Sequence, residues 1–174
     1  MIRGPMGFDF KRFRAKEDIK KSIKSIEDLL ATRIVETPPY NAVSWAVVSR
    51  LSVLVRDLVE KSDALAGKRV DFTDDVIVRG RVRDAASLIT FMRDALCHIE
   101  SDNHLLSPTT ELTLIAAFGK AKPNRSHPSG ADIPPADYDD DIAFIFGVQR
   151  IYFRRHLLRA FRESVANLSD FLKK

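Results

Sequence analysis

The chain has 174 residues, of which 45% are hydrophobic and 30% charged, which suits one globular domain and excludes a disordered or fibrous protein. Its net charge of +4 permits an anionic partner such as RNA without requiring one, and its single cysteine excludes an intramolecular disulfide and a cysteine-based zinc site. No apolar run reaches the roughly 20 residues that span a bilayer, and residues 1–16 lack the apolar core of a secretory signal, so we expect a cytoplasmic protein without membrane contact.

Residues 1–13 combine glycine and proline with phenylalanines among basic residues, and we expect them to form an N-terminal arm. Such a segment can bind nucleic acid by stacking, although docking of its aromatic side chains on the domain or on a second subunit is the more ordinary use. A helix is predicted from about Lys16 to Ile34, because its apolar residues recur at spacings of three and four. Pro38 and Pro39 follow this helix, and proline cannot donate a helical hydrogen bond.

A second helix is predicted from Asn41, a favourable N-cap residue, to Ala66, with Gly67 as its C-cap. Apolar residues cover so much of its circumference that the helix must be central or packed against another subunit. After a short linker, Thr73 and the two aspartates that follow it are typical of a further helix start.

Residues 105–147 form an insertion of different character. Two short apolar runs, at 112–118 and 142–146, predict two antiparallel strands. The segment 121–136 between them is rich in proline, serine, asparagine and glycine, and predicts a long surface loop. The last helix is predicted from about Val148 to Leu172 by its regular apolar stripe.

The expected fold is therefore mainly α. We predict a single domain over residues 1–174, built as a four- to five-helix up-down bundle with a small inserted β-hairpin.

From Val82 a helical apolar period runs past Arg93, Asp94 and His98. Arginine can hold a phosphate in a bidentate fork, and histidine titrates near neutrality and can transfer protons. Together they supply the cation and the base that RNA cleavage needs without a metal. On an ideal helix the two side chains lie about 140° apart, so they share a face only if the helix ends near His98, where the turn predicted at 101–103 makes such an ending plausible.

The sequence Arg93-Asp94-x-x-x-His98, late in a predicted helix, resembles the signature of the HEPN superfamily (higher eukaryotes and prokaryotes nucleotide-binding): arginine, a polar residue, a few further residues and histidine. The resemblance is specific around the motif and only architectural elsewhere, and the 105–147 insertion departs from it. It implies that Arg93 and His98 are catalytic in a metal-independent endoribonuclease, with Asp94 orienting them and with no cofactor. It also implies a homodimer in which two motifs meet in a cleft.

Many HEPN proteins belong to toxin–antitoxin or other defence systems, so the resemblance extends to an antitoxin or nucleotidyltransferase partner. Other members are non-catalytic modules that bind a partner protein or a nucleotide, and this is the alternative function. A third interpretation is a structural helical dimer in which Arg93 pairs with an acid such as Glu100 or Asp94 and His98 is buried.

Basic residues of the last predicted helix are further candidates for contacts with RNA phosphates, namely Arg150, Arg154 and Arg155, with His156 beside them. An ordinary solvated helix face is the alternative.

The acidic residues at 137–141 suggest a divalent cation, but they lack the alternating ligand spacing of a calcium loop. We expect a solvated turn or a charge block there, and no metal. Cys97 adjoins His98, but neighbouring residues on a helix face different directions, so we expect a buried thiol rather than a nucleophilic dyad.

Overall fold

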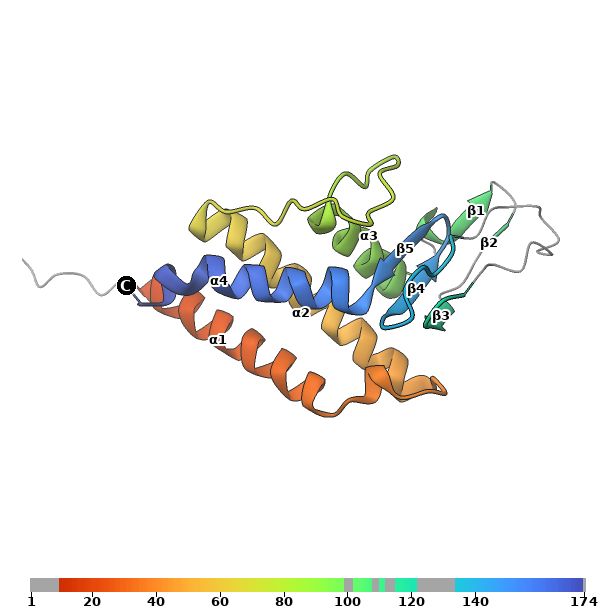
Figure 1. The fold of residues 1–174 in the computed structure, drawn as a ribbon. Helices are drawn as coiled ribbons and strands as arrows, with labels where there is room; N and C mark the ends of the chain where they lie inside the picture. Colours follow the sequence, from red (N-terminus) through yellow and green to blue (C-terminus); the bar gives the residue numbers. More distant parts are fainter. Residues whose placement is uncertain (1–9, 99–101, 108–109, 112–114, 122–133, 174) are drawn as a thin grey trace, which may run out of the picture.

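The computed structural model describes residues 10–98, 102–107, 110–111, 115–121 and 134–173 (Figure 1). Within them the chain is mainly helical, with a small three-stranded antiparallel sheet, as predicted in outline. The α-helices are α1 (Phe10–Ala31), α2 (Ala42–Ala66), α3 (Ala85–Cys97) and α4 (Arg159–Lys173). Two short 3-10 helices lie at η1 (Ile34–Glu36) and η2 (Asp102–His104), and a π-helix, η3 (Phe153–Leu158), leads into α4. The strands are β1 (Leu105–Ser107), β2 (Thr110–Glu111), β3 (Ile115–Phe118), β4 (Ile142–Phe146) and β5 (Gln149–Tyr152).

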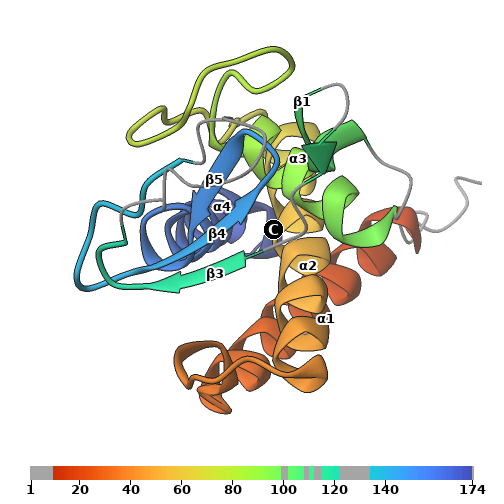
Figure 2. The same ribbon diagram turned by 90° about the vertical axis from the view of Figure 1, so that its right-hand side faces the viewer.

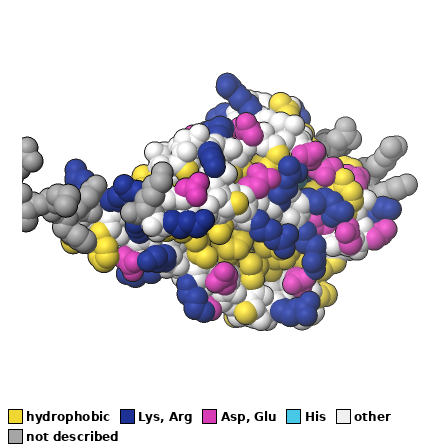
Figure 3. All heavy atoms as spheres, turned by 60° about the vertical axis from the view of Figure 1, so that its left-hand side comes forward, with side chains coloured by type: hydrophobic (Ala, Val, Ile, Leu, Met, Phe, Trp, Pro, Cys, Tyr) yellow, Lys and Arg dark blue, Asp and Glu magenta, His cyan; other side chains and the backbone are white. Residues whose placement is uncertain are grey.

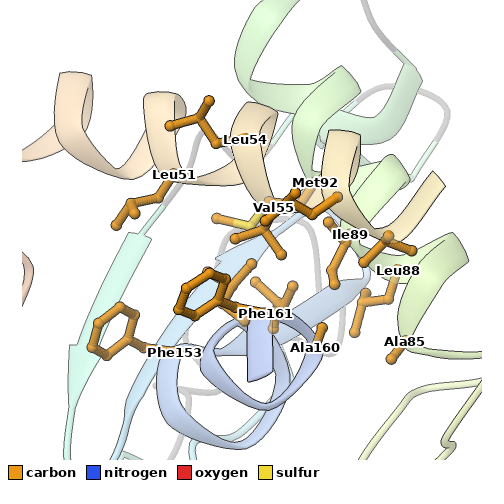
Figure 4. Packing of buried hydrophobic residues seen from close by; sticks show 14 of the residues in the cluster. Leu51, Leu54, Val55, Ala85, Leu88, Ile89, Met92, Phe153, Ala160 and Phe161 are labelled. Carbon is orange, nitrogen blue, oxygen red and sulfur yellow. The ribbon is translucent and has the colours of Figure 1, made fainter. Parts of the chain in front are cut away.

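Helix α2 is the element on which the other helices pack. It contacts α4 most extensively, then α3 and α1. In the first view of the ribbon it crosses behind α4 (Figure 1), and the view turned by 90° shows it beside α1 and α3 (Figure 2). Val55 of α2 points toward Met92 of α3 and Phe161 of α4, whereas Leu54 points away from them (Figure 4). Most of the apolar face of this helix is therefore covered within one chain, as the central interpretation expects, while Val43 and Leu65 are exposed. The up-down order of the helices stays a prediction.

The ends of α2 follow the sequence signals closely. The side-chain oxygen of Asn41 accepts hydrogen bonds from the backbone N–H groups of Val43 at 2.9 Å and Ser44 at 3.1 Å. Ser44 completes a capping box with Asn41. Gly67 ends the helix with φ 64°, a left-handed conformation that glycine adopts without steric cost. Both predicted caps are confirmed.

The helix predicted to start at Thr73 is wrong. Residues 74–75 form a turn, and a second turn at Gly80 is closed by the bridge between Arg79 and Val82. The helix begins only at Ala85, because Asp84 caps it: the Asp84 carboxylate accepts from the backbone N–H of Ser87 at 2.8 Å. Thr73 and its aspartates have the composition of a cap but no apolar period directly after them.

The predicted hairpin is part of a larger sheet. Strands β3 and β4 pair antiparallel, as expected, with Ile115 opposite Ile145. A third strand, β5, pairs with β4 across a two-residue turn in which Gly147 has a positive φ. The last helix therefore does not begin at Val148: the chain is extended to Tyr152 and enters α4 through η3.

Burial explains why β5 was missed. All four of its residues are buried, so no alternation of polar and apolar side chains marks it as a strand. One face of the sheet packs on the helices through Phe144 and Phe146, and the other is covered by Ala136 and Tyr138.

The N-terminal arm is shorter than predicted. Helix α1 already begins at Phe10, and Phe10 and Phe13 are exposed or half-exposed on its first turns. Residues 1–9 of the predicted arm and most of the 121–136 loop lie outside the described residues.

None of the described helices is both long and apolar enough to cross a bilayer. On the face seen in Figure 3, hydrophobic side chains form a continuous area bordered by charged side chains, most of them lysine and arginine.

Replacing Leu58 by alanine should destabilise the fold strongly. Its side chain is fully buried in the middle of α2, so truncation leaves a cavity and should lower the free energy of unfolding by about 2–5 kcal/mol. Urea unfolding measures this value. The matched control is Leu65→Ala on the same helix, where the side chain is 39% exposed and the expected loss is below about 1 kcal/mol. Equal losses in the two variants would contradict the central position of α2.

Candidate functional site

The motif residues meet where α3 ends. The helix stops at Cys97, and His98 has the extended conformation φ −126°, ψ 102° while its N–H still donates to the Asp94 carbonyl at 3.0 Å. This break in the helix lets the imidazole turn back toward Arg93, so that Arg93 Nη1 lies 3.2 Å from His98 Nε2. The condition that the sequence set, a helix ending near His98, is met, and the contact forms within one chain.

Asp94 holds the arginine in place. Arg93 Nη1 donates to Asp94 Oδ1 at 2.9 Å, and both side chains are about one-third exposed, at 31% and 33%. The hydrogen bond to Asp94 raises the pKa of Arg93, and the negative charges of Asp94 and Glu60 act in the same direction. The guanidinium therefore keeps its full charge at the surface of the protein.

The contact between Arg93 and His98 fixes the form of the imidazole. An arginine N–H can only donate, so a hydrogen bond to Nε2 requires the lone pair of that nitrogen. The imidazole is then neutral, with its proton on Nδ1. A neutral histidine on an exposed helix end, as His98 is, has the form that a general base requires.

The third interpretation, in which Arg93 pairs with an acid and His98 is buried, agrees with the structure only in part. Arg93 does pair with Asp94, but His98 is exposed and not buried. Cys97 is exposed as well, against the expectation of a buried thiol, because α3 ends there and its last turn faces outward.

A pocket of about 260 Å³ adjoins the motif. It lies between α2 and α3, and Asp94 belongs to its wall together with Glu60, Asp63, Arg69, Arg81 and Asn103. Apart from Asp94, sequence reasoning did not find these residues, because they come from α2, the loop before α3 and η2. Only the packing of α3 on α2 brings them together.

The three arginines predicted to bind RNA are each paired with acidic side chains. Arg150 lies on β5 and not on the last helix, is 7% exposed and pairs with Asp137. Arg154 pairs with Glu36. Arg155 pairs with Asp140 at 2.9 Å, and its guanidinium lies over the Tyr138 ring. They do not form one open basic helix surface.

The acidic cluster forms a turn in which Asp137, Asp139 and Asp140 are exposed, but Asp141 differs from the expected solvated turn. Its side chain is buried and accepts hydrogen bonds from the backbone N–H groups of Arg154 at 2.8 Å and Arg155 at 3.1 Å, at the start of η3. Asp137 and Asp140 pair with arginines, and Asp139 pairs with Lys120 at 3.2 Å. In the part of the chain that the structure describes, no group of three or more histidine, cysteine, aspartate or glutamate residues could hold a metal ion.

His156 lies in the core, away from any RNA-binding surface. It is fully buried; Nδ1 accepts from the Tyr152 N–H at 3.0 Å, and Nε2 is 2.9 Å from the carbonyl oxygen of Asp74. Since Nδ1 accepts, the proton is on Nε2, which donates to Asp74. Burial lowers the pKa of His156 below its ordinary value.

A scan of family models and searches of curated proteins and of solved structures find no match to this chain. The HEPN resemblance therefore depends on the motif and its geometry alone.

The buried His156 should make the protein less stable in mild acid. An unfolded histidine takes up a proton around pH 6.5, whereas folded His156 does so only at lower pH. The contribution to stability is therefore complete above pH 6.5 and is lost as the pH falls below it. Urea unfolding at pH 7.5 and 5.5 should show this loss in the wild type, and a smaller loss in a folded His156→Gln variant. The same loss in both proteins would contradict the assignment.

Proposed function

We propose that the chain is a metal-independent endoribonuclease of HEPN type. The observation that carries the proposal is the contact of Arg93 with His98 at the exposed end of α3. A cation next to a neutral imidazole is the minimum that cleavage of RNA by its own 2′-hydroxyl requires.

In the proposed reaction, His98 accepts the proton of the ribose 2′-hydroxyl through Nε2. The 2′-oxygen then forms a bond to phosphorus while the bond from phosphorus to the 5′-oxygen breaks. The leaving oxygen takes a proton from the imidazolium, so that a 2′,3′-cyclic phosphate and a 5′-hydroxyl result. Arg93 stabilises the negative charge on the pentacoordinate phosphorus.

Asp94 is a positioning residue in this scheme. It orients Arg93 through Nη1, and among the described residues Nη2 and Nε are left for the phosphate. Nη1 contacts His98 directly at 3.2 Å, so a bound phosphate has to take the place of that contact.

A homodimer in the cytoplasm, with two motifs at one cleft and the helices in up-down order, belongs to the same proposal. The hydrophobic area in Figure 3 supports an interface, because large exposed apolar patches mark interaction sites. Arg93 and His98 contact each other within one chain, so the dimer is not needed to bring this pair together. Sedimentation equilibrium tests whether the protein is a dimer. Arg154, which is 49% exposed, stays a candidate for contact with RNA, as does the partly buried Arg155, whereas Arg150 would first have to leave Asp137.

RNA cleavage in EDTA tests the proposed activity. His98→Ala should lower the rate by about 100-fold or more, because it removes the general base, and Arg93→Ala should have a comparable effect. Cys97→Ala is the matched control: it changes the adjacent exposed residue and should leave the rate unchanged. Equal cutting by the wild type and His98→Ala, or no cutting by the folded wild type, would refute the proposal.

A non-catalytic HEPN module that binds a nucleotide or a partner protein is the second candidate. The pocket beside Asp94 favours this function. The hydrogen bond from Arg93 to Asp94 also favours it, because it engages the arginine that a nuclease would use on the phosphate. Tight RNA binding without turnover, unchanged in His98→Ala, would select this function. Co-purification of an antitoxin or a nucleotidyltransferase would identify the system.

A further inference from the structure

The pocket between α2 and α3 is contiguous with the proposed catalytic pair. Asp94 belongs to the pocket wall and is hydrogen-bonded to Arg93 at 2.9 Å, and Arg93 in turn contacts His98 at 3.2 Å. A nucleotide whose phosphate lies at Arg93 therefore has its base next to this pocket. The volume of about 260 Å³ is just below the range of about 300–1,000 Å³ that is usual for drug-sized ligands, which suits a single base.

The hydrogen-bond donor of the pocket is Arg81. Its Nη2 donates to the side-chain oxygen of Asn103 at 2.9 Å, and Asn103 is buried and donates to the Phe91 carbonyl oxygen at 3.0 Å. Arg81 is thus anchored by a neutral amide, and among the described residues no carboxylate pairs with it. Arg69, which also lines the pocket, is already bound by Asp84 through Nε at 3.0 Å and Nη2 at 2.8 Å.

The acceptors come from α2. Glu60 and Asp63 are three residues apart, so they lie on one face of the helix, and their side chains are 52% and 54% exposed. Oε1 of Glu60 pairs with Arg56, and Oδ2 of Asp63 lies 3.8 Å from Arg69 Nη1, so the second carboxylate oxygen of each residue is the acceptor for a ligand. Phe91, Val59 and Ala86 supply apolar surface of the pocket. A ligand that fits this pocket is flat and apolar on its faces, with adjacent donors on one edge and adjacent acceptors on another.

Guanine has this pattern. Its O6 and N7 accept the two N–H groups of an arginine fork, and its N1–H and amino group donate together to one carboxylate. Adenine and cytosine each carry one amino group with no ring N–H beside it, and uracil carries one ring N–H, so none of them offers two adjacent donor groups to one carboxylate.

We propose that this pocket is a guanine-binding subsite, with Arg81 at the O6–N7 edge and Glu60 at the N1–amino edge. The role of this subsite in RNA cleavage depends on the proposed nuclease function, but its binding of guanine does not. If the nuclease is active, the subsite directs cutting to positions that carry guanine.

Binding of nucleoside 3′-monophosphates to the full chain tests the subsite without any turnover. Titrations followed by NMR should show guanosine 3′-monophosphate binding roughly tenfold or more tightly than the adenosine, cytidine and uridine compounds, in the wild type and in His98→Ala, since one bidentate contact is sufficient for such a factor. Arg81→Met and Glu60→Gln should each remove this preference. Arg83→Met is the matched control, because Arg83 is an exposed arginine of the same loop that does not line the pocket.

Equal binding of the four nucleotides, no binding, or equal effects of Arg81→Met and Arg83→Met would overturn the subsite. RNA cleavage separates its failure from that of the nuclease. Cutting that depends on His98 but is indifferent to guanine leaves the nuclease standing and refutes the subsite. Guanine binding that depends on Arg81 and Glu60, without any cutting, supports the subsite and refutes the nuclease.

Discussion

The burial of α2 is the constraint on which the rest of the structure depends. Its side chains are buried along one broad face, from Ser44 to Ser62, and a helix of this kind needs covering elements along its whole length. Helices α1, α3 and α4 provide them, and the sheet closes the same core through Phe144 and Phe146. The position of α3, and so of the candidate site, follows from this requirement, because Leu88, Ile89 and Met92 must face α2.

With α3 held in this orientation, the arrangement of the candidate site depends on the backbone conformation of His98, where the helix ends. A continued helix would hold His98 on a different face from Arg93. The extended conformation of His98 removes that separation and places its imidazole against the arginine. The carboxylate of Asp94 then fixes the guanidinium, and the same carboxylate lines the pocket. One helix end thus carries a cation, a neutral base and a wall of the neighbouring cavity.

The pairing of arginines with carboxylates explains why a basic chain lacks one open basic surface around β5 and η3. Buried Asp141 receives the first N–H groups of η3 and the guanidinium of Arg155, which offsets the cost of burying its charge. Asp137 forms an ion pair with the buried Arg150 of β5. Asp141 therefore has a structural role at the start of η3, where the sequence suggested only a solvated turn.

The sequence by itself determined the elements whose signals are local. The capping residues Asn41 and Gly67, the apolar periods of α1 and α2, and the arginine–histidine motif all depend on neighbours within a few residues. Only the tertiary structure decided the start of the last helix, the partners of Arg150 and His156, and the pocket around Arg81 and Glu60. Strand β5 is buried on both faces and its sequence has no strand period, while the pocket joins residues from α2, α3 and two connecting segments. Such features arise from contacts between distant segments, which no local pattern encodes.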